Sequence, residues 1–260
     1  MTLTKSYVGL RRDAQHRYYW GDGPAMPGVT ATLKMLDKSG ALVGWAKRET
    51  AACAVRNLPM LEELVKTGGQ AAAINWLKSI PDYQRDTSAD LGTRIHVLAE
   101  ARAKNEPVPA SEEELPFLLS YEAFLDEHHP TIIATEFMVA NLELRYGGTA
   151  DALMLIGDET WLIDYKTGGS VYPETALQLA GLAHATFMGH PDDPEQHPIP
   201  RIDRFGVLHL RPGEHECWDD QLYGGQHLIE FAVGPQEWAA FRACRALWGW
   251  ANERAQGVMA

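Results

Sequence analysis

The chain has 260 residues, of which 45% are hydrophobic and 22% are charged, and these values are ordinary for a folded soluble protein. No apolar run approaches the roughly 18 residues that span a bilayer, and residues 1–10 lack the apolar segment of a signal peptide, so we expect a cytoplasmic protein without a membrane segment. The formal net charge of −12, taken alone, argues against a nucleic-acid partner, because phosphate groups attract cations.

The first half of the chain predicts mostly helices. The helix expected at residues 87–105 is the best defined, because Leu91, Ile95 and Leu98 follow the 3.6-residue period. Other helices are expected at residues 30–36, 41–58, 59–66, 69–80 and 111–128, after a short strand at residues 18–20.

Positive charge is concentrated in the N-terminal part. Residues 1–60 contain nine Lys and Arg against four Asp and Glu, a net charge of +5, whereas the remainder contains 14 against 31, a net charge of −17. A basic lobe could guide DNA toward a carboxylate-lined metal site, or the N-terminal helices could simply carry solvated basic side chains. We divide the chain into a basic, helical N-terminal elaboration at residues 1–86 and a core at residues 87–260, which could also form one continuous domain.

The second half predicts strands interspersed with helices. A turn at Gly157-Asp158-Glu159 separates two apolar segments and is typical of a β-hairpin. The expected strands span residues 131–140, 150–156, 161–165 and 205–210, the expected helices span residues 174–188 and 236–255, and residues 191–200 form a proline-rich loop. This order predicts an α/β fold in which helices flank a central mixed β-sheet.

The cysteines Cys53, Cys217 and Cys244 are too few and too scattered for a disulfide framework or a four-thiolate cluster. We expect reduced, mostly buried thiols and no iron–sulfur cluster. A zinc site formed by His209, His215 and Cys217 is disfavoured, because their spacing on an expected strand and turn is poor for one ion.

Charged residues interrupt the otherwise apolar segment that ends at Lys166. Alternate residues of a strand point the same way, so Asp164 and Lys166 share one face while Tyr165 points to the other. If Asp151 pairs opposite Asp164 across the hairpin, two carboxylates lie close together and suit Mg²⁺ or Mn²⁺. A register slip of one residue would turn Asp151 to the opposite face.

This arrangement predicts hydrolysis of phosphodiesters. A cation held by Asp151 and Asp164 would neutralise a phosphate oxygen and lower the pKa of a bound water. Lys166 would orient or activate that water, or stabilise the negative charge that develops in the transition state.

Gly148-Thr149-Ala150-Asp151, followed by Asp164-Tyr165-Lys166-Thr167-Gly168, resembles the signature of the PD-(D/E)XK nuclease superfamily. Within it, the chain resembles RecB-like exonucleases, including phage-borne members related to CRISPR-associated exonucleases. The resemblance implies a restriction-endonuclease-like core, in which Asp151, Asp164 and Lys166 are catalytic and His96, Asp151 and Asp164 bind the metal ion. Further contacts to the site or the substrate are expected at Glu136, Thr149 and Gln178.

The chain departs from the family pattern at two points. Leu182 stands where the last family motif has a tyrosine, and the four cysteines that many relatives use for an iron–sulfur cluster are not present in the sequence. The core acid of the last motif is Asp164 rather than Glu, which the superfamily pattern allows.

The function expected from this resemblance is a DNA exonuclease that acts in phage or bacterial recombination, replication or repair. DNA is then a partner, together with a recombination or annealing protein, and the location is the host cytoplasm for a phage-encoded chain. The alternatives are a non-catalytic DNA-binding protein of the same fold and a restriction-type endonuclease. The spacing of the residues does not distinguish cleavage at ends from internal cleavage.

Overall fold

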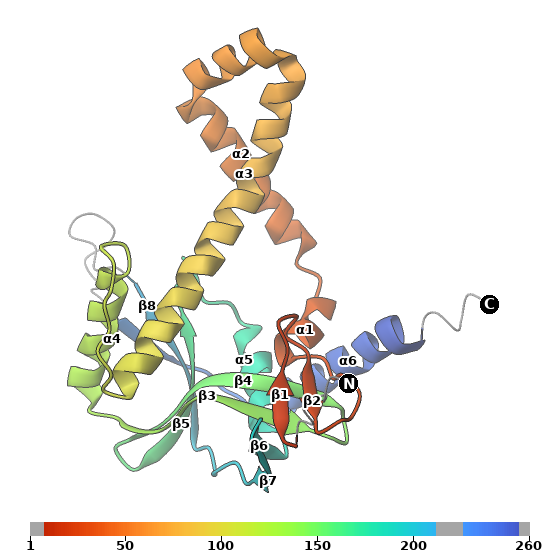
Figure 1. Cartoon of the computed structure of the whole chain (residues 1–260), viewed down its shortest axis with the longest axis vertical. Coiled ribbons are helices and arrows are strands. Elements are labelled where there is room, and N and C mark those ends of the chain that lie inside the picture. Colours follow the sequence, from red (N-terminus) through yellow and green to blue (C-terminus); the bar gives the residue numbers. More distant parts are fainter. Residues whose placement is uncertain (1–7, 212–225, 255–260) are drawn as a thin grey trace, which may run out of the picture. The chain divides into compact units, whose positions relative to one another are not determined.

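The computed structural model describes residues 8–211 and 226–254 of the chain (Figure 1). The chain divides into two compact units. The first, which we call the sheet unit, comprises Met1–Met35 and Ile95–Ala260, and the second, which we call the helical unit, comprises Leu36–Arg94.

A seven-stranded mixed β-sheet forms the centre of the sheet unit. Its strand order is β7-β6-β3-β4-β5-β8-β9, with β5 parallel to β8 and every other neighbouring pair antiparallel. The strands are β3 (Thr131–Asn141), β4 (Tyr146–Ile156), β5 (Glu159–Lys166), β6 (Phe187–His190), β7 (Asp193–His197), β8 (Arg204–Leu210) and β9 (Gln226–Glu230). Strands β1 (Leu10–Arg12) and β2 (Tyr18–Trp20) form a separate antiparallel pair. The predicted α/β fold with a mixed sheet and flanking helices is confirmed.

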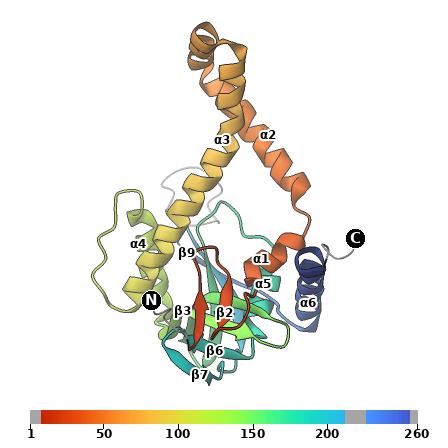
Figure 2. The same cartoon turned by 45° about the vertical axis from the view of Figure 1, so that its right-hand side comes forward.

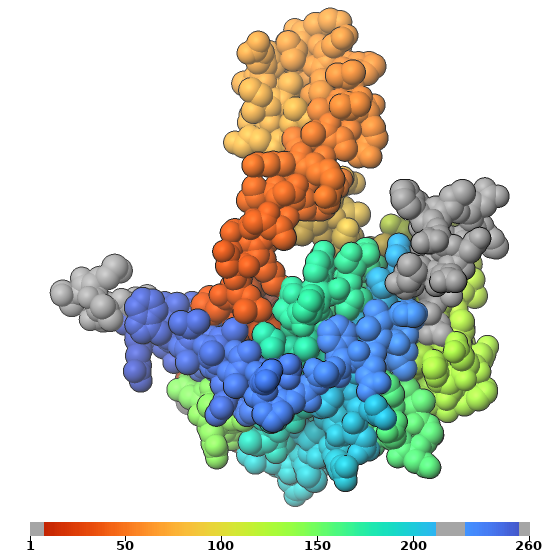
Figure 3. All heavy atoms as spheres, turned by 180° about the vertical axis from the view of Figure 1, so that it is seen from behind, coloured from red at the N-terminus to blue at the C-terminus, as the bar shows by residue number. Residues whose placement is uncertain are grey.

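Helices cover both faces of this sheet. Adjacent residues of β5 point to opposite faces: Tyr165 contacts Tyr121 of α4 (Leu115–His128), and Asp164 contacts Gln178 of α5 (Thr175–Ala183). Helix α4 therefore covers one face and α5 the other (Figure 2). The unit also contains the end of α3 from Ile95 onward, α1 (Val29–Thr32), η1 (Leu33–Met35), α6 (Pro235–Gly249), which packs on α5 (Figure 3), and η2 (Trp250–Arg254).

Two glycines let the central strand β4 accept close packing on both sides. A Cβ atom at Gly147 would lie 2.4 Å from the ring of Tyr18, and one at Gly148 would lie 2.5 Å from Leu182. Real Cβ contacts are never this short, so larger residues would push these elements apart. The packing holds β2 against one face of β4 and α5 against the other.

The helical unit consists of α2 (Ser39–Arg56) and most of α3 (Leu58–Ala103). Gly69 interrupts α3 with a φ of 74°, which glycine adopts without a steric penalty. The predicted helix end before Pro81 was wrong: the helix continues through this proline, which removes one backbone hydrogen bond. Although α3 contains 46 residues, neither it nor another helix in the described ranges is long and apolar enough to cross a membrane.

Two further segments differ from the expected elements. The helix predicted at residues 174–188 ends at Ala183, and β6 follows it at the edge of β3. The proline-rich segment predicted as a loop contains β7, whose pairing with β6 is irregular. Proline is tolerated in such edge strands, because one side of the strand needs no hydrogen-bond partner in the sheet.

Candidate functional site

The hairpin of β4 and β5 has the predicted register. Ile156 pairs with Glu159 across the Gly157-Asp158 turn, and the pairing continues in step until Asp151 and Asp164 lie level with one another. Because ladder pairing stops just before this point, the side chain of Asp151 can reach the backbone of β5. Its Oδ2 atom accepts a 2.6 Å hydrogen bond from the N–H of Tyr165, the residue between Asp164 and Lys166.

A third carboxylate lies level with Asp151 on the other neighbouring strand. The β3–β4 pairs on either side, Thr135 with Ala152 and Phe137 with Ala150, place Glu136 level with Asp151. Glu136 has a φ of 46°, a left-handed conformation that costs an ordinary residue roughly 1–2 kcal/mol. Strain of this kind is typical of functional sites, where the surrounding structure holds a side chain in a required direction.

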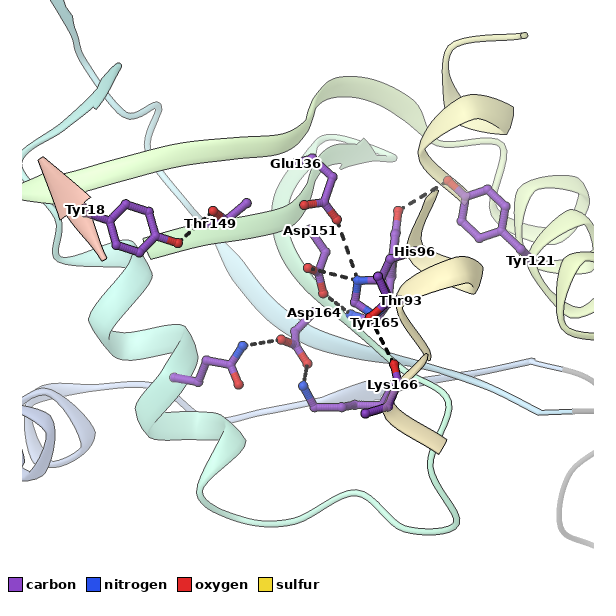
Figure 4. Close-up of polar contacts among 12 residues, drawn as sticks. Tyr18, Thr93, His96, Tyr121, Glu136, Thr149, Asp151, Asp164, Tyr165 and Lys166 are labelled. Atoms are coloured by element: carbon purple, nitrogen blue, oxygen red, sulfur yellow. Dashed lines mark hydrogen bonds and ion pairs between the residues drawn. The ribbon is translucent and has the colours of Figure 1, made fainter. Parts of the chain in front are cut away.

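His96, from the part of α3 that belongs to the sheet unit, completes this group (Figure 4). Its Nδ1 atom lies 3.4 Å from Asp151 Oδ1 and 3.6 Å from Glu136 Oε1. One ligand atom from each of the three residues lies within 4.8 Å of the others. Ligands of one Mg²⁺ ion, each about 2.1 Å from it, are separated by comparable distances, so the three side chains could converge on one cation.

The carboxylates of Asp151 and Glu136 raise the pKa of His96. Burial lowers the pKa of the imidazole, but hydrogen bonds and charge from Asp151 and Glu136 outweigh that effect and raise its pKa to about 10. Without a metal ion, the imidazolium therefore supplies the positive charge between the two carboxylates. A cation bound there would take over this role, with His96 as a neutral ligand.

Asp164 belongs to a second, adjoining network. Its Oδ1 atom accepts a 2.5 Å hydrogen bond from Gln178 Nε2, and the ammonium of Lys166 lies 2.5 Å from Oδ2 (Figure 4). The carboxylate is 3% exposed. Burial raises its pKa, while the charge of Lys166 limits the rise. The same ion pair raises the pKa of Lys166 against the opposite effect of burial.

The structure therefore divides the predicted site residues between two networks. His96 and Asp151 lie with Glu136, whereas Asp164 is paired with Lys166 and Gln178. The networks adjoin through the backbone of Tyr165, and Asp164 is close enough to Asp151 for that charge to raise its pKa.

The other predicted positions have structural partners. Thr149 Oγ1 shares a 2.8 Å hydrogen bond with the hydroxyl of Tyr18. Leu182, at the position of the family tyrosine, is buried against Gly148 and supplies packing. His209 of β8 pairs with Lys166 of β5, and its Nε2 atom is 2.6 Å from Gly168 O. The other residues of the disfavoured zinc site, His215 and Cys217, lie outside the described residues.

Sequence reasoning missed the aromatic residues that surround the site. The ring of Tyr165 lies edge-on to His96 with 5.7 Å between centroids, and its hydroxyl is 3.3 Å from that of Tyr121. The alternation along β5 already turned Tyr165 away from Asp164, but no local pattern identifies Tyr121 or Tyr18 as partners. Their contacts depend on segments that are distant in the sequence.

A second His and carboxylate group lies on β7, where ligand atoms of Asp193, Glu195 and His197 approach within 4.8 Å of one another. It was not expected from the sequence. Glu195 and His197 are exposed, and exposed acidic groups of this kind are common in the absence of an ion.

In comparisons with known proteins, no family model matches the chain, and no curated protein matches it. The function is therefore inferred from the donor set, the charge of the site and the motif resemblance. Three carboxylates and one ammonium leave two negative charges when His96 is neutral. A divalent cation would balance them, and imidazole and carboxylate donors suit Mn²⁺ as well as Mg²⁺.

Proposed function

We propose that this chain is a divalent-metal-dependent deoxyribonuclease that hydrolyses phosphodiester bonds. The observation that carries the proposal is the group of His96, Glu136 and Asp151 beside the buried ion pair of Asp164 and Lys166. A buried carboxylate and a strained glutamate are costly to maintain in a protein that uses them only for packing. The resemblance to PD-(D/E)XK nucleases supports the same chemistry.

His96, Glu136 and Asp151 would hold Mg²⁺ or Mn²⁺, and Asp164 would add its negative charge and act as a further ligand. The ion, when bound, supplies positive charge for a phosphate oxygen and lowers the pKa of a water molecule. The Tyr165 amide fixes Asp151, and Gln178 fixes Asp164, so both carboxylates are oriented before substrate arrives.

Lys166 carries the second part of the chemistry. Asp164 holds its ammonium at the end of β5 while about a third of the side chain stays accessible, at 34%. A phosphate group could therefore approach this cation from solvent. In that position Lys166 stabilises negative charge that develops on the phosphate, or orients the attacking water.

The finer proposal is a DNA exonuclease of phage or bacterial recombination, replication or repair, with a recombination or annealing protein as partner. The preference for an exonuclease rests on the family resemblance. A restriction-type endonuclease and a DNA-binding protein without catalysis are the alternatives. The intact pair of Asp164 and Lys166 favours catalysis over binding alone, because binding does not require a buried carboxylate.

The test uses the full chain with linear and with closed-circular DNA, in Mg²⁺, in Mn²⁺ and in excess chelator. Asp151→Asn removes one charged ligand and preserves the shape of the side chain. Asp158→Asn is the matched control, because Asp158 is exposed in the turn of the same hairpin. We expect the wild type and the control to degrade DNA only with metal, and Asp151→Asn to be inactive.

The outcomes separate the candidate functions. Degradation of linear DNA alone supports an exonuclease, and cutting of the circle supports an endonuclease. DNA binding without cleavage under every metal condition would overturn the proposal in favour of a binding protein. Equal activity of Asp151→Asn and Asp158→Asn would show that the cleavage does not come from this site.

A further inference from the structure

The helical unit lacks a hydrophobic core of its own. Among its residues, all of which the structure describes, the only buried hydrophobic side chains are Cys53 and Ala73. Helices α2 and α3 scarcely contact one another along their lengths. Most of the stability of helices in proteins comes from tertiary packing, because helix propensity alone seldom offsets the cost of ordering the chain.

Large apolar side chains of this unit instead face solvent. Eight of them are at least 42% exposed, namely Leu42, Val43, Val55, Leu58, Met60, Val65, Ile74 and Tyr83. They occur on both α2 and α3. Single exposed hydrophobics are normal on a protein surface, but a concentration of this kind indicates an interaction surface.

The charge of the helical unit favours a protein over a nucleic acid as the molecule that binds to these exposed apolar side chains. Residues 36–94 contain eight Lys and Arg against seven Asp and Glu, a net charge of +1, whereas the rest of the chain carries −13. An excess of cations favours binding to the phosphates of DNA, and this unit has almost no such excess. Nearly equal numbers of opposite charges, interspersed with apolar residues, instead allow the surface to pair with a copy of itself without net repulsion.

We propose that the helical unit is a self-association surface, which packs against the helical unit of a second copy of this chain. Two pairs of helices can bury apolar residues between them in a four-helix arrangement, a common solution for helices that lack a core of their own. A stable interface involves about 20–30 residues from each partner, and a two-fold interface uses the same surface on both. The 59 residues of Leu36–Arg94 provide enough helix surface for such an interface. The proposal does not depend on the nuclease activity.

The first test measures the mass of the full chain by sedimentation velocity at increasing protein concentration. We expect a concentration-dependent dimer or a higher symmetric oligomer. A monomer at every concentration up to about 100 µM, which corresponds to a Kd no tighter than that value, would overturn the proposal.

The second test uses Leu42→Glu, Val55→Glu and Ile74→Glu, which introduce charge at exposed positions of the helical unit. Leu119→Glu is the matched control, because Leu119 on α4 of the sheet unit is as exposed as Leu42, at 58%. Each change in the helical unit should weaken association about tenfold or more, as expected for a central interface residue, and the control should not. Association that none of the three changes weakens would place the interface elsewhere and overturn the proposal.

Hydrogen exchange provides a test without mutation. Amides of α2 should exchange slowly at a high protein concentration and faster on dilution, because dilution uncovers the helical unit. Exchange that is independent of protein concentration, but slows on addition of DNA, would identify DNA as the covering molecule and overturn self-association.

Discussion

The sheet unit buries a charged side chain together with its partners, whereas the helical unit exposes large apolar side chains that have no covering element within the unit. Asp164 is 3% exposed and is held by Lys166 and Gln178, while Val55 of α2 is 71% exposed. Burial of a charged group costs its hydration free energy, and exposure of an apolar side chain forgoes the hydrophobic effect, so both placements are costly. We therefore propose different roles for the two units: a metal and substrate site in the sheet unit, and a surface for self-association in the helical unit.

After Asp151→Asn, the largest expected effect on the proposed nuclease activity is that of a substitution in the sheet unit, at Lys166. Lys166→Met keeps most of the side-chain volume and removes the ammonium, so cleavage should fall by about 10²–10³-fold, the effect of removing one group that stabilises developing charge. Lys47→Met on the exposed surface of α2 is the matched control and should leave the rate unchanged. The measurement is the rate of release of acid-soluble nucleotides from linear DNA.

Two results would contradict this expectation. Comparable rates for Lys166→Met and Lys47→Met would remove Lys166 from the chemistry. A loss of rate accompanied by a loss of Mn²⁺ binding, followed by electron paramagnetic resonance, would assign Lys166 to the metal group instead. The expected result is a slow enzyme that still binds the ion.

The relative placement of the candidate site residues of β4 and β5 could be predicted from the sequence, because their spacing is local. A two-residue turn determines the register of a hairpin, and the alternation of a strand then places Asp151 level with Asp164 and turns Tyr165 away. The division of Asp151 and Asp164 between two networks could not be predicted. It depends on where ladder pairing stops and on His96 and Gln178, which come from helices elsewhere in the chain.

The helical secondary structure of the helical unit could be predicted from the sequence, but the ends of its helices could not. Helical periodicity identified most of α2 and α3, whereas Pro81 suggested an end that the structure does not contain. Proline lowers helix stability without forbidding a helix, so local preference overestimated its effect. The exposure of the apolar residues was not predictable either, because periodicity shows which face is apolar and not what covers it.

A second prediction concerns packing in the sheet unit. Gly148→Ala places a methyl group against Leu182 and Val29 at less than normal contact distance, so the free energy of unfolding should fall by about 1–3 kcal/mol. Gly169→Ala is the control, because a methyl group there meets no atom within 4 Å. Urea unfolding followed by tryptophan fluorescence provides the measurement. Equal stability of the two variants would mean that α5 does not pack closely on β4.

A third prediction tests whether the site maintains strain at Glu136. Glu136→Gly and Glu136→Ala both remove the carboxylate, but only glycine accepts the left-handed φ of 46° without a steric penalty. The glycine variant should therefore be more stable than the alanine variant by roughly 1–2 kcal/mol in urea unfolding. At neighbouring Thr135, which has an ordinary strand conformation, the same pair should show the opposite order. Alanine as the more stable variant at both positions would contradict a strained Glu136.

The smallest expected effect lies in the helical unit, where an added methyl group meets open space. Gly44 is inside α2, and a Cβ atom there has no atom within 4 Å. Gly44→Ala should stabilise α2 by about 0.5–1 kcal/mol, because alanine loses less backbone entropy in a helix than glycine does. The free energy of local opening, measured from hydrogen exchange of α2 amides in dilute protein, provides the measurement.

The same substitution also tests the difference between the units, because whether it stabilises or destabilises α2 depends on what packs over Gly44. In dilute monomer, Gly44→Ala should slow exchange, whereas Gly148→Ala destabilises the sheet unit although both changes add one methyl group. If Gly44→Ala instead speeds exchange in concentrated protein, and Gly148→Ala shows no such change with concentration, a helix of the second copy lies close to the backbone of Gly44. Slower exchange at both concentrations would instead place the contact between copies on other faces of α2 and α3. Faster exchange in dilute monomer would contradict an uncovered α2, because only a neighbouring atom within the same chain could oppose the added methyl group.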